Sequence, residues 1–257
     1  MTVIYRRARL TAIVALLFSS FAHAQQTATS GTFVLHKFAN AIGSETYSIE
    51  AKDGSYTLTS HFKFTDRGTE VPLETTFVAE AGTMTPVSYS AKGKASRQAD
   101  MNDAVAVSGN NLSIVRSGKP ETQTASQPWF ITDGYFPAAM QEQMMRWWLS
   151  HGKPESFTAY PSKAKVRIEP AETLNIAGVP VHGFTVSGLI WGQESLWMDD
   201  SQNLMALVAR TQNSITLKPS GGPMKRTLTS LLLPPLRRIC RPCQGSRQAR
   251  EWLRRKS

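Results

Sequence analysis

The chain has 257 residues and a formal net charge of +10, and its basic residues are concentrated toward its ends. Residues 25–213 hold 15 Lys and Arg against 18 Asp and Glu, whereas residues 214–257 hold 11 against one. A nucleic-acid partner would require basic residues gathered on a folded face, so no such partner is expected despite an isoelectric point of about 9.8.

The amino terminus has the pattern of a secretory signal peptide over residues 1–24. Arg6, Arg7 and Arg9 precede an apolar run from residue 10 to 21, and Ala22-His23-Ala24 forms an A-x-A cleavage site. The run is shorter than the roughly 20 apolar residues of a transmembrane helix, although an uncleaved anchor is the alternative. We therefore expect an exported protein, periplasmic or extracellular, with no transmembrane anchor after cleavage and a short linker at 25–30.

The region from residue 31 to 212 is dominated by alternation of apolar and polar residues. Tyr56, Leu58, Phe62 and Phe64 share one face of a predicted strand, and the pattern recurs through residues 71–79. Glycine-containing breaks separate these runs at spacings typical of hairpins. The pattern predicts one domain built on a meandering antiparallel sheet that is solvated on one side.

One segment, residues 137–151, departs from this alternation. Its apolar residues fall at helical spacing, Pro137 suits a first helical turn, and Gly152 suits a position just past the helix end. A single helix must bury its apolar stripe against another element. We expect this helix to pack in the concavity of the sheet.

A final hairpin is predicted from residue 189 to 208. The strand that ends at Met198 is followed by the polar turn Asp199–Asn203 and then by a second apolar strand. Asp is a favoured turn former, so the paired Asp199 and Asp200 are read as turn residues.

Residues 213–257 lack apolar alternation and are rich in Arg, Pro and Ser. Three interpretations stay open: a disordered basic tail, the translation of a shifted reading frame, or a small metal or redox element. The third depends on Cys240 and Cys243, the only cysteines, which could pair as a small-loop disulfide. A zinc site needs about four ligands, and no second cysteine pair exists.

Several segments carry a resemblance to a known family. They are residues 33–38, 42–47, 62–68, 188–192 and 196–199, with the sequences FVLHKF, IGSETY, FKFTDRG, GLIWG and LWMD. Together they resemble the amino-terminal β-rich extension of exported bacterial amidohydrolases of the acidobacterial type. The order of features is also similar to periplasmic curved-sheet domains related to outer-membrane lipoprotein carriers.

The resemblance covers residues 31–212 and implies that a metal-dependent catalytic barrel should follow. Such a barrel takes about 250 residues, and 44 remain after residue 213. The resemblance therefore implies a β module without its catalytic half, and the abrupt basic tail favours a frameshifted gene copy.

No catalytic, cofactor-binding or metal-ligating set is expected from the residues. The chain has no Gly-x-Ser-x-Gly elbow, and four histidines, His36, His61, His151 and His182, are isolated in the sequence. The remaining candidate is an apolar groove on the helix. It would consist of Met140, Met144, Trp147 and Trp148, since Met and Trp side chains suit adaptable apolar sites, with simple core packing as the competing interpretation.

The predicted fold class is mainly β: a single curved antiparallel sheet, or half-barrel, packed around one α-helix. The predicted function is that of a non-catalytic exported module, the accessory part of an amidohydrolase. Two alternatives stay open. One is a carrier-like domain that binds an apolar ligand or a protein partner in the cell envelope, and the other is a truncated hydrolase.

Overall fold

The computed structural model describes residues 28–37, 40–66, 68–94, 99–133, 136–176, 178–209 and 214–218. The predicted signal peptide and nearly all of the predicted tail, including Cys240 and Cys243, lie outside these residues. The first half of the described chain forms β1 (Ala28–Lys37), β2 (Asn40–Lys52), β3 (Ser55–Asp66), β4 (Thr69–Glu80), β5 (Pro86–Lys94), β6 (Asp100–Ser108), β7 (Asn111–Arg116) and β8 (Lys119–Thr124). The second half forms β9 (Trp129–Ile131), α1 (Ala138–Ser150), β10 (Phe157–Tyr160), β11 (Ala164–Pro170), β12 (Leu174–Ile176), β13 (Val179–Ser187), β14 (Gln193–Met198), β15 (Leu204–Ala209) and β16 (Ser214–Leu217).

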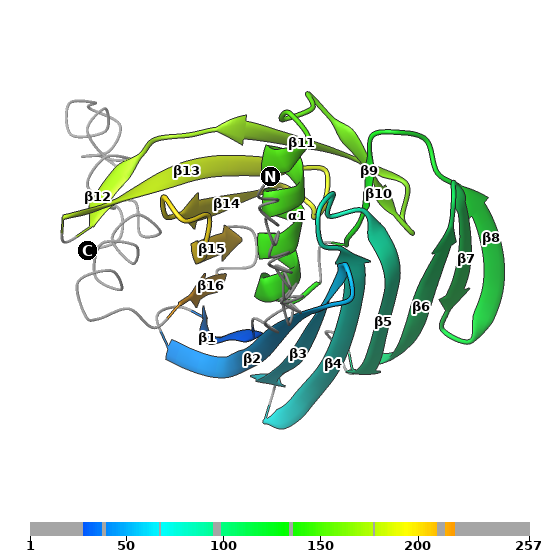
Figure 1. The fold of residues 1–257 in the computed structure, drawn as a ribbon. Helices are drawn as coiled ribbons and strands as arrows, with labels where there is room; N and C mark the ends of the chain where they lie inside the picture. Colours follow the sequence, from blue (N-terminus) through cyan, green and yellow to red (C-terminus); the bar gives the residue numbers. More distant parts are fainter. Residues whose placement is uncertain are drawn as a thin grey trace, which may run out of the picture.

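The strands form one large sheet that bends around α1 without closing (Figure 1). Its order is β8-β7-β6-β5-β4-β3-β2-β1-β16-β15-β14-β13-β11-β10-β9, with β12 paired to β13 beside this path. Neighbours along the chain pair in sequence, as hairpin connections require. The mainly β fold class, with one curved sheet around one helix, is confirmed.

One strand pair differs from the antiparallel sheet that we predicted. β9 pairs with β10 in parallel, with Trp129 opposite Thr158 and Ile131 opposite Tyr160. The chain passes from β9 through α1 to β10, and such a crossover through a helix returns the chain in the same direction. The helix inside the sheet is therefore the connection of a β-α-β unit.

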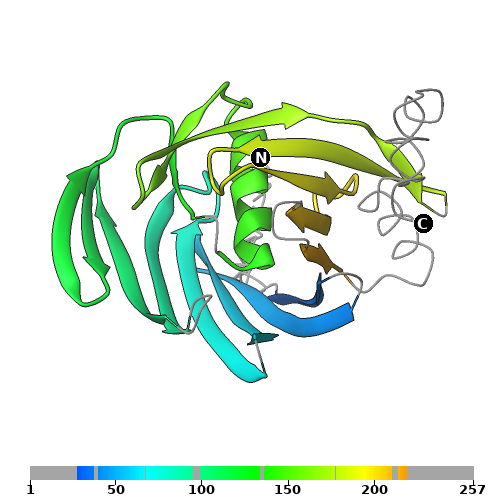
Figure 2. The ribbon, with the colours of Figure 1, turned by 180° about the vertical axis from the view of Figure 1, so that it is seen from behind.

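The helix is enclosed by the sheet, which Figure 2 shows from behind. Its buried residues point in every direction around its axis and include the polar Gln141, Glu142 and Gln143. Strand residues at alternating positions line the sheet's inner face, among them Leu58, Phe77 and Leu112. The main core thus lies between α1 and the concave face.

A second, smaller cluster lies on the opposite face of the sheet. Trp197 alternates with Leu196 and Met198, which belong to the main core, and so points to the other side. Val181, Ala206, Val208 and Leu217 complete this cluster. Apolar residues therefore lie on both faces of β13, β14 and β15, whereas β4 presents a mainly polar outer face.

Described strands extend past the predicted domain of residues 31–212 at both ends. β1 begins at Ala28, inside the expected linker. β16 lies beyond the predicted end at 212, where Leu217 is buried and pairs with both Val34 and Ala206. The strand is only four residues long, so its alternation was too short to distinguish it from the tail. Among the described residues, no helix has the length and apolarity to cross a membrane.

Candidate functional site

The four residues of the predicted apolar groove all lie in the main core. Met140 and Met144 have no exposed surface, and Trp147 and Trp148 are each 2% exposed. Trp147 contacts the rings of Phe130 and Phe157, with centroid distances of 5.4 and 5.0 Å. Both tryptophans are buried because the sheet curves around the helix.

Trp148 is the member of this set that also borders the surface. It lines a depression of about 280 Å³ at the end of α1, together with Lys153, Pro154, Arg167 and other residues. Its indole Nε1 donates a hydrogen bond to the Pro154 carbonyl oxygen at 3.0 Å, and its ring meets that of Phe184 edge-on at 5.9 Å. The indole N–H is therefore engaged within the protein.

The start of α1 is held by a buried carboxylate from β2. Glu45 accepts hydrogen bonds from the backbone N–H groups of Ala138 at 2.7 Å and Ala139 at 3.1 Å, and from the Ser60 hydroxyl at 2.8 Å. These donors and the positive end of the helix dipole favour the ionised form. Burial outweighs them and raises the pKa of Glu45 to about 7. We call this cluster of Glu45, Ser60 and the helix start the first anchor.

A second anchor joins the middle of the helix to the β14–β15 turn. Glu142 forms an ion pair with Arg146 at 2.9 Å and accepts a hydrogen bond from the Leu204 N–H at 2.9 Å. Arg146 also donates to the Asn203 side chain at 2.9 Å. Burial raises the pKa of Tyr47 to about 12, and the negative charge of Glu142 acts in the same direction. The two anchors connect α1 to strands on both sides of the β1–β16 pairing.

A third buried carboxylate, Glu194, shares the inner face of β14 with Leu196. Burial raises its pKa to about 7. Its Oε2 atom has no hydrogen-bond partner among the described residues, and the same holds for the Tyr56 hydroxyl oxygen and the Trp129 Nε1 atom. The interior therefore contains several buried polar atoms that make no hydrogen bond to another described residue.

Sequence reasoning missed these buried carboxylates, although a signal for one was present. Glu45 falls on the same period-two face as Tyr47 and Ile49, which predicts an inward position. A charge on an apolar face usually has a buried partner. The partner, however, is the start of a helix 93 residues away, and alternation within one strand cannot identify it.

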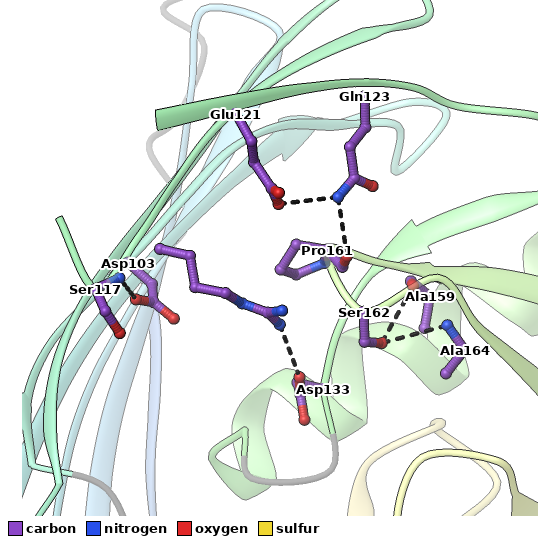
Figure 3. A network of polar contacts seen from close by, with 10 residues as sticks. Asp103, Ser117, Glu121, Gln123, Asp133, Ala159, Pro161, Ser162 and Ala164 are labelled. Carbon is purple, nitrogen blue, oxygen red and sulfur yellow. Dashed lines mark hydrogen bonds and ion pairs between the residues drawn. The ribbon is translucent and has the colours of Figure 1, made fainter. Parts of the chain in front are cut away.

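The two ends of the open sheet meet through side chains, in what we call the seam (Figure 3). Gln123 on β8 donates to Glu121 at 2.9 Å and to the Pro161 carbonyl oxygen at 3.2 Å. Arg116 approaches Asp133 at 3.7 Å. The Tyr160 hydroxyl donates to the Thr124 carbonyl oxygen at 3.2 Å. Side chains, rather than a strand ladder, hold these edges together.

The isolated histidines are placed on the surface or at structural positions. His61 lies 3.7 Å from Glu74 and His182 lies 2.7 Å from Asp200, in both cases as exposed pairs. His151 ends α1, where its Nδ1 lies 2.8 Å from the Trp147 carbonyl oxygen. Within the described residues, no group of three or more His, Cys, Asp or Glu is placed to hold a metal ion.

A wide, shallow depression of about 790 Å³ lies over β4 to β8. Small residues on the outer face contribute to it, including Thr76, Ser88, Ala104 and Ser113. These residues alternate with core positions such as Phe77 and Tyr89, so they point away from α1. This surface offers hydroxyl groups and methyl groups without a charged cluster.

No family model matches the chain, and no curated protein matches it. Among solved structures, the chain is similar to a beta-barrel-like protein of the domain of unknown function DUF1849 from Brucella abortus. The identity is 8% and the TM-score 0.47, over 73% of this chain and 93% of that one. A DUF1329 family protein from Desulfovibrio piger gives 9% identity and a TM-score of 0.20, over 76% and 83% of the two chains. Both similarities are too weak to carry an argument, so the fold is described from this chain alone.

Proposed function

We propose that the chain is a non-catalytic β module of an exported protein, and that it is the accessory amino-terminal part of an amidohydrolase. The observation that carries this proposal is the burial of α1, ten of whose 13 residues are buried inside the curved sheet. A sheet whose concave face is filled by its own helix keeps its outer surfaces for contact with other molecules. Such a unit suits attachment to a larger protein.

Two further observations support the proposal. The resemblance to amidohydrolase extensions spans residues 31–212, which covers most of the described sheet. The described histidines are engaged in surface pairs, in a helix end and in a backbone contact, since His36 Nδ1 lies 3.2 Å from the Val34 carbonyl oxygen. The described histidines therefore make structural contacts, as expected for a module that does not itself catalyse a reaction.

The nucleotide sequence that encodes residues 205–257 and the DNA beyond it test the accessory role. A shifted frame that continues with a His-x-His pair and the pattern of an α/β barrel would support it. A hydrolase assay on the purified chain complements this reading, and we expect no activity. Hydrolysis that survives extensive purification and chelation would contradict the proposal.

A carrier-like function is the second candidate, and the composition of α1 favours it. Three methionines, Met140, Met144 and Met145, lie fully buried beside Trp147, and flexible thioether side chains can repack around an apolar guest. In this function the guest would have to displace part of the core. Saturable binding of a neutral apolar dye distinguishes this candidate from the accessory module.

Export is part of the proposal and has a separate test. The positively charged start, the apolar run and Ala22-His23-Ala24 support cleavage after residue 24. Sequencing of the mature amino terminus should begin at Gln25. A mature protein that retains residues 1–24 in a membrane fraction would support an uncleaved anchor instead.

A further inference from the structure

Trp191 differs from the other described large apolar residues in its exposure. It is 90% exposed, whereas Val87, Val115 and Val179 are 36–48% exposed. The four other described tryptophans are at most 9% exposed. Burial of a large aromatic side chain stabilises a folded protein. The indole of Trp191 contributes little of this stabilisation, so its exposed position favours a role at the surface.

The loop that carries Trp191 has a fixed base. Residues 188–192 connect β13 to β14, and Gly188 and Gly192 both have a φ of 94°, which L side chains rarely adopt. A Cβ atom at Gly188 would overlap the Lys165 carbonyl oxygen, so the backbone lies directly against β11. Residues 188–193, GLIWGQ, contain no charge. The loop therefore presents an uncharged apolar tip from a firm support.

Basic residues lie beside the base of this loop. Ser187 at the loop base pairs with Arg167 on β11, and Gly188 packs against Lys165. Lys163 lies in the turn before β11 and Lys165 lies on β11, and both are exposed. Arg167 forms an ion pair with Glu155 at 3.1 Å, so the two lysines provide the positive charge that can meet an external anion.

We propose that this loop docks on an anionic lipid surface, with Trp191 in the headgroup region and Lys163 and Lys165 against the lipid phosphates. Tryptophan favours the boundary between apolar and aqueous phases, and nearby lysines add attraction to anionic lipids. A specific protein interface covers about 800 Å² on each partner, more than one indole supplies. The size and charge of the feature thus favour a membrane over a protein partner, independently of the accessory role.

Binding of the full chain to lipid vesicles tests this proposal. Vesicles of phosphatidylcholine with phosphatidylglycerol are compared with vesicles of phosphatidylcholine alone, by co-sedimentation at low and high salt. We expect Trp191→Ala to weaken binding to the anionic vesicles on the order of tenfold. The double change Lys163→Gln and Lys165→Gln should weaken it at low salt by at least a similar factor. Val179→Ala is the matched control, since it removes an exposed apolar side chain elsewhere on β13.

Fluorescence locates the indole independently of the affinity. A Trp252→Phe background leaves the five described tryptophans, of which Trp191 is the exposed one. Its emission should shift to shorter wavelength when anionic vesicles are added. The basic carboxyl-terminal segment is present in every variant, so differences between variants report on the loop. Equal binding of the wild-type and Trp191→Ala chains, equal binding to neutral vesicles, or an unshifted emission would each overturn the proposal.

Discussion

Glu45 on β2 and Ala138 at the start of α1 are joined by a hydrogen bond of 2.7 Å across 93 residues of sequence. The bond places the negative carboxyl group against the positive end of the helix, where two backbone N–H groups would otherwise be buried without partners. α1 has no capping side chain of its own, since Pro137 occupies the N-cap position. The sheet supplies the cap that the local sequence lacks.

Glu45→Ala should destabilise the protein by about 1–3 kcal/mol, the range for leaving buried hydrogen-bonding groups without a partner. Urea unfolding followed by circular dichroism measures the change. Glu172→Gln is a matched control at an exposed carboxylate, with an expected effect within about 0.5 kcal/mol. Equal unfolding midpoints for Glu45→Ala and the wild-type chain would show that the first anchor contributes nothing.

The same carboxyl group predicts how stability depends on pH. The pKa values of Glu45 and Glu194 are raised from 4.5 to about 7 in the folded protein. Between these values the folded state holds more protons than the unfolded state, so stability is greatest below the unfolded pKa and falls as pH rises. The loss for each group has an upper limit of about 3 kcal/mol.

Unfolding free energies measured from pH 4.5 to pH 8 test this dependence. Glu45→Gln should reduce the slope because it removes one of the two titrating groups. A slope that is the same in both proteins would contradict the assignment to Glu45. An unfolding free energy that rises with pH between pH 4.5 and pH 8 would contradict the predicted fall in stability.

Trp147→Ala and Trp148→Ala should each destabilise the protein by about 3–5 kcal/mol, the range for removing a buried large aromatic residue. Both side chains are 2% exposed and contact different parts of the sheet. Thermal or urea unfolding compares the two. If neither change lowered the midpoint, the helix residues would be better described as a binding surface than as core.

Removal of β16 should weaken the sheet, because this strand joins β1 to β15. We predict that a chain ending at residue 213 is at least about 2 kcal/mol less stable than one ending at Lys218, since Leu217 loses its burial. Denaturant unfolding of the two shortened chains measures the difference. Equal stabilities would restore the boundary first predicted from the sequence.

The sequence was sufficient to predict those parts of the fold that repeat locally. The faces of β3 and β4, the helix near residues 138–150 and the β14–β15 turn all follow from alternation, helical spacing and turn-forming residues. The parallel β9–β10 pair was not predictable in this way. Its three-residue strand Trp129–Ile131 has too few residues for a period, and its partner is chosen by the path through α1.

The buried polar contacts were beyond the sequence for a different physical reason. Gln141, Glu142 and Gln143 read as the solvated side of an amphipathic helix, and only a sheet that surrounds the helix buries them. Their partners, such as the Leu204 N–H for Glu142, lie far away in the chain. The candidate groove residues Met140, Met144, Trp147 and Trp148 were recognised as apolar, but their enclosure depends on the curvature of the whole sheet.

The central claim is that α1 fills the concavity of the sheet, and titration with a neutral apolar dye tests it most directly. The full chain is titrated with Nile red, and the Trp147→Ala variant, which has a cavity in its core, serves as the positive comparison. The account predicts no saturable binding to the wild-type chain and a gain of binding in the variant, because a site opens only when the indole is removed. Stoichiometric, saturable binding to the wild-type chain would contradict it and would support the carrier-like function.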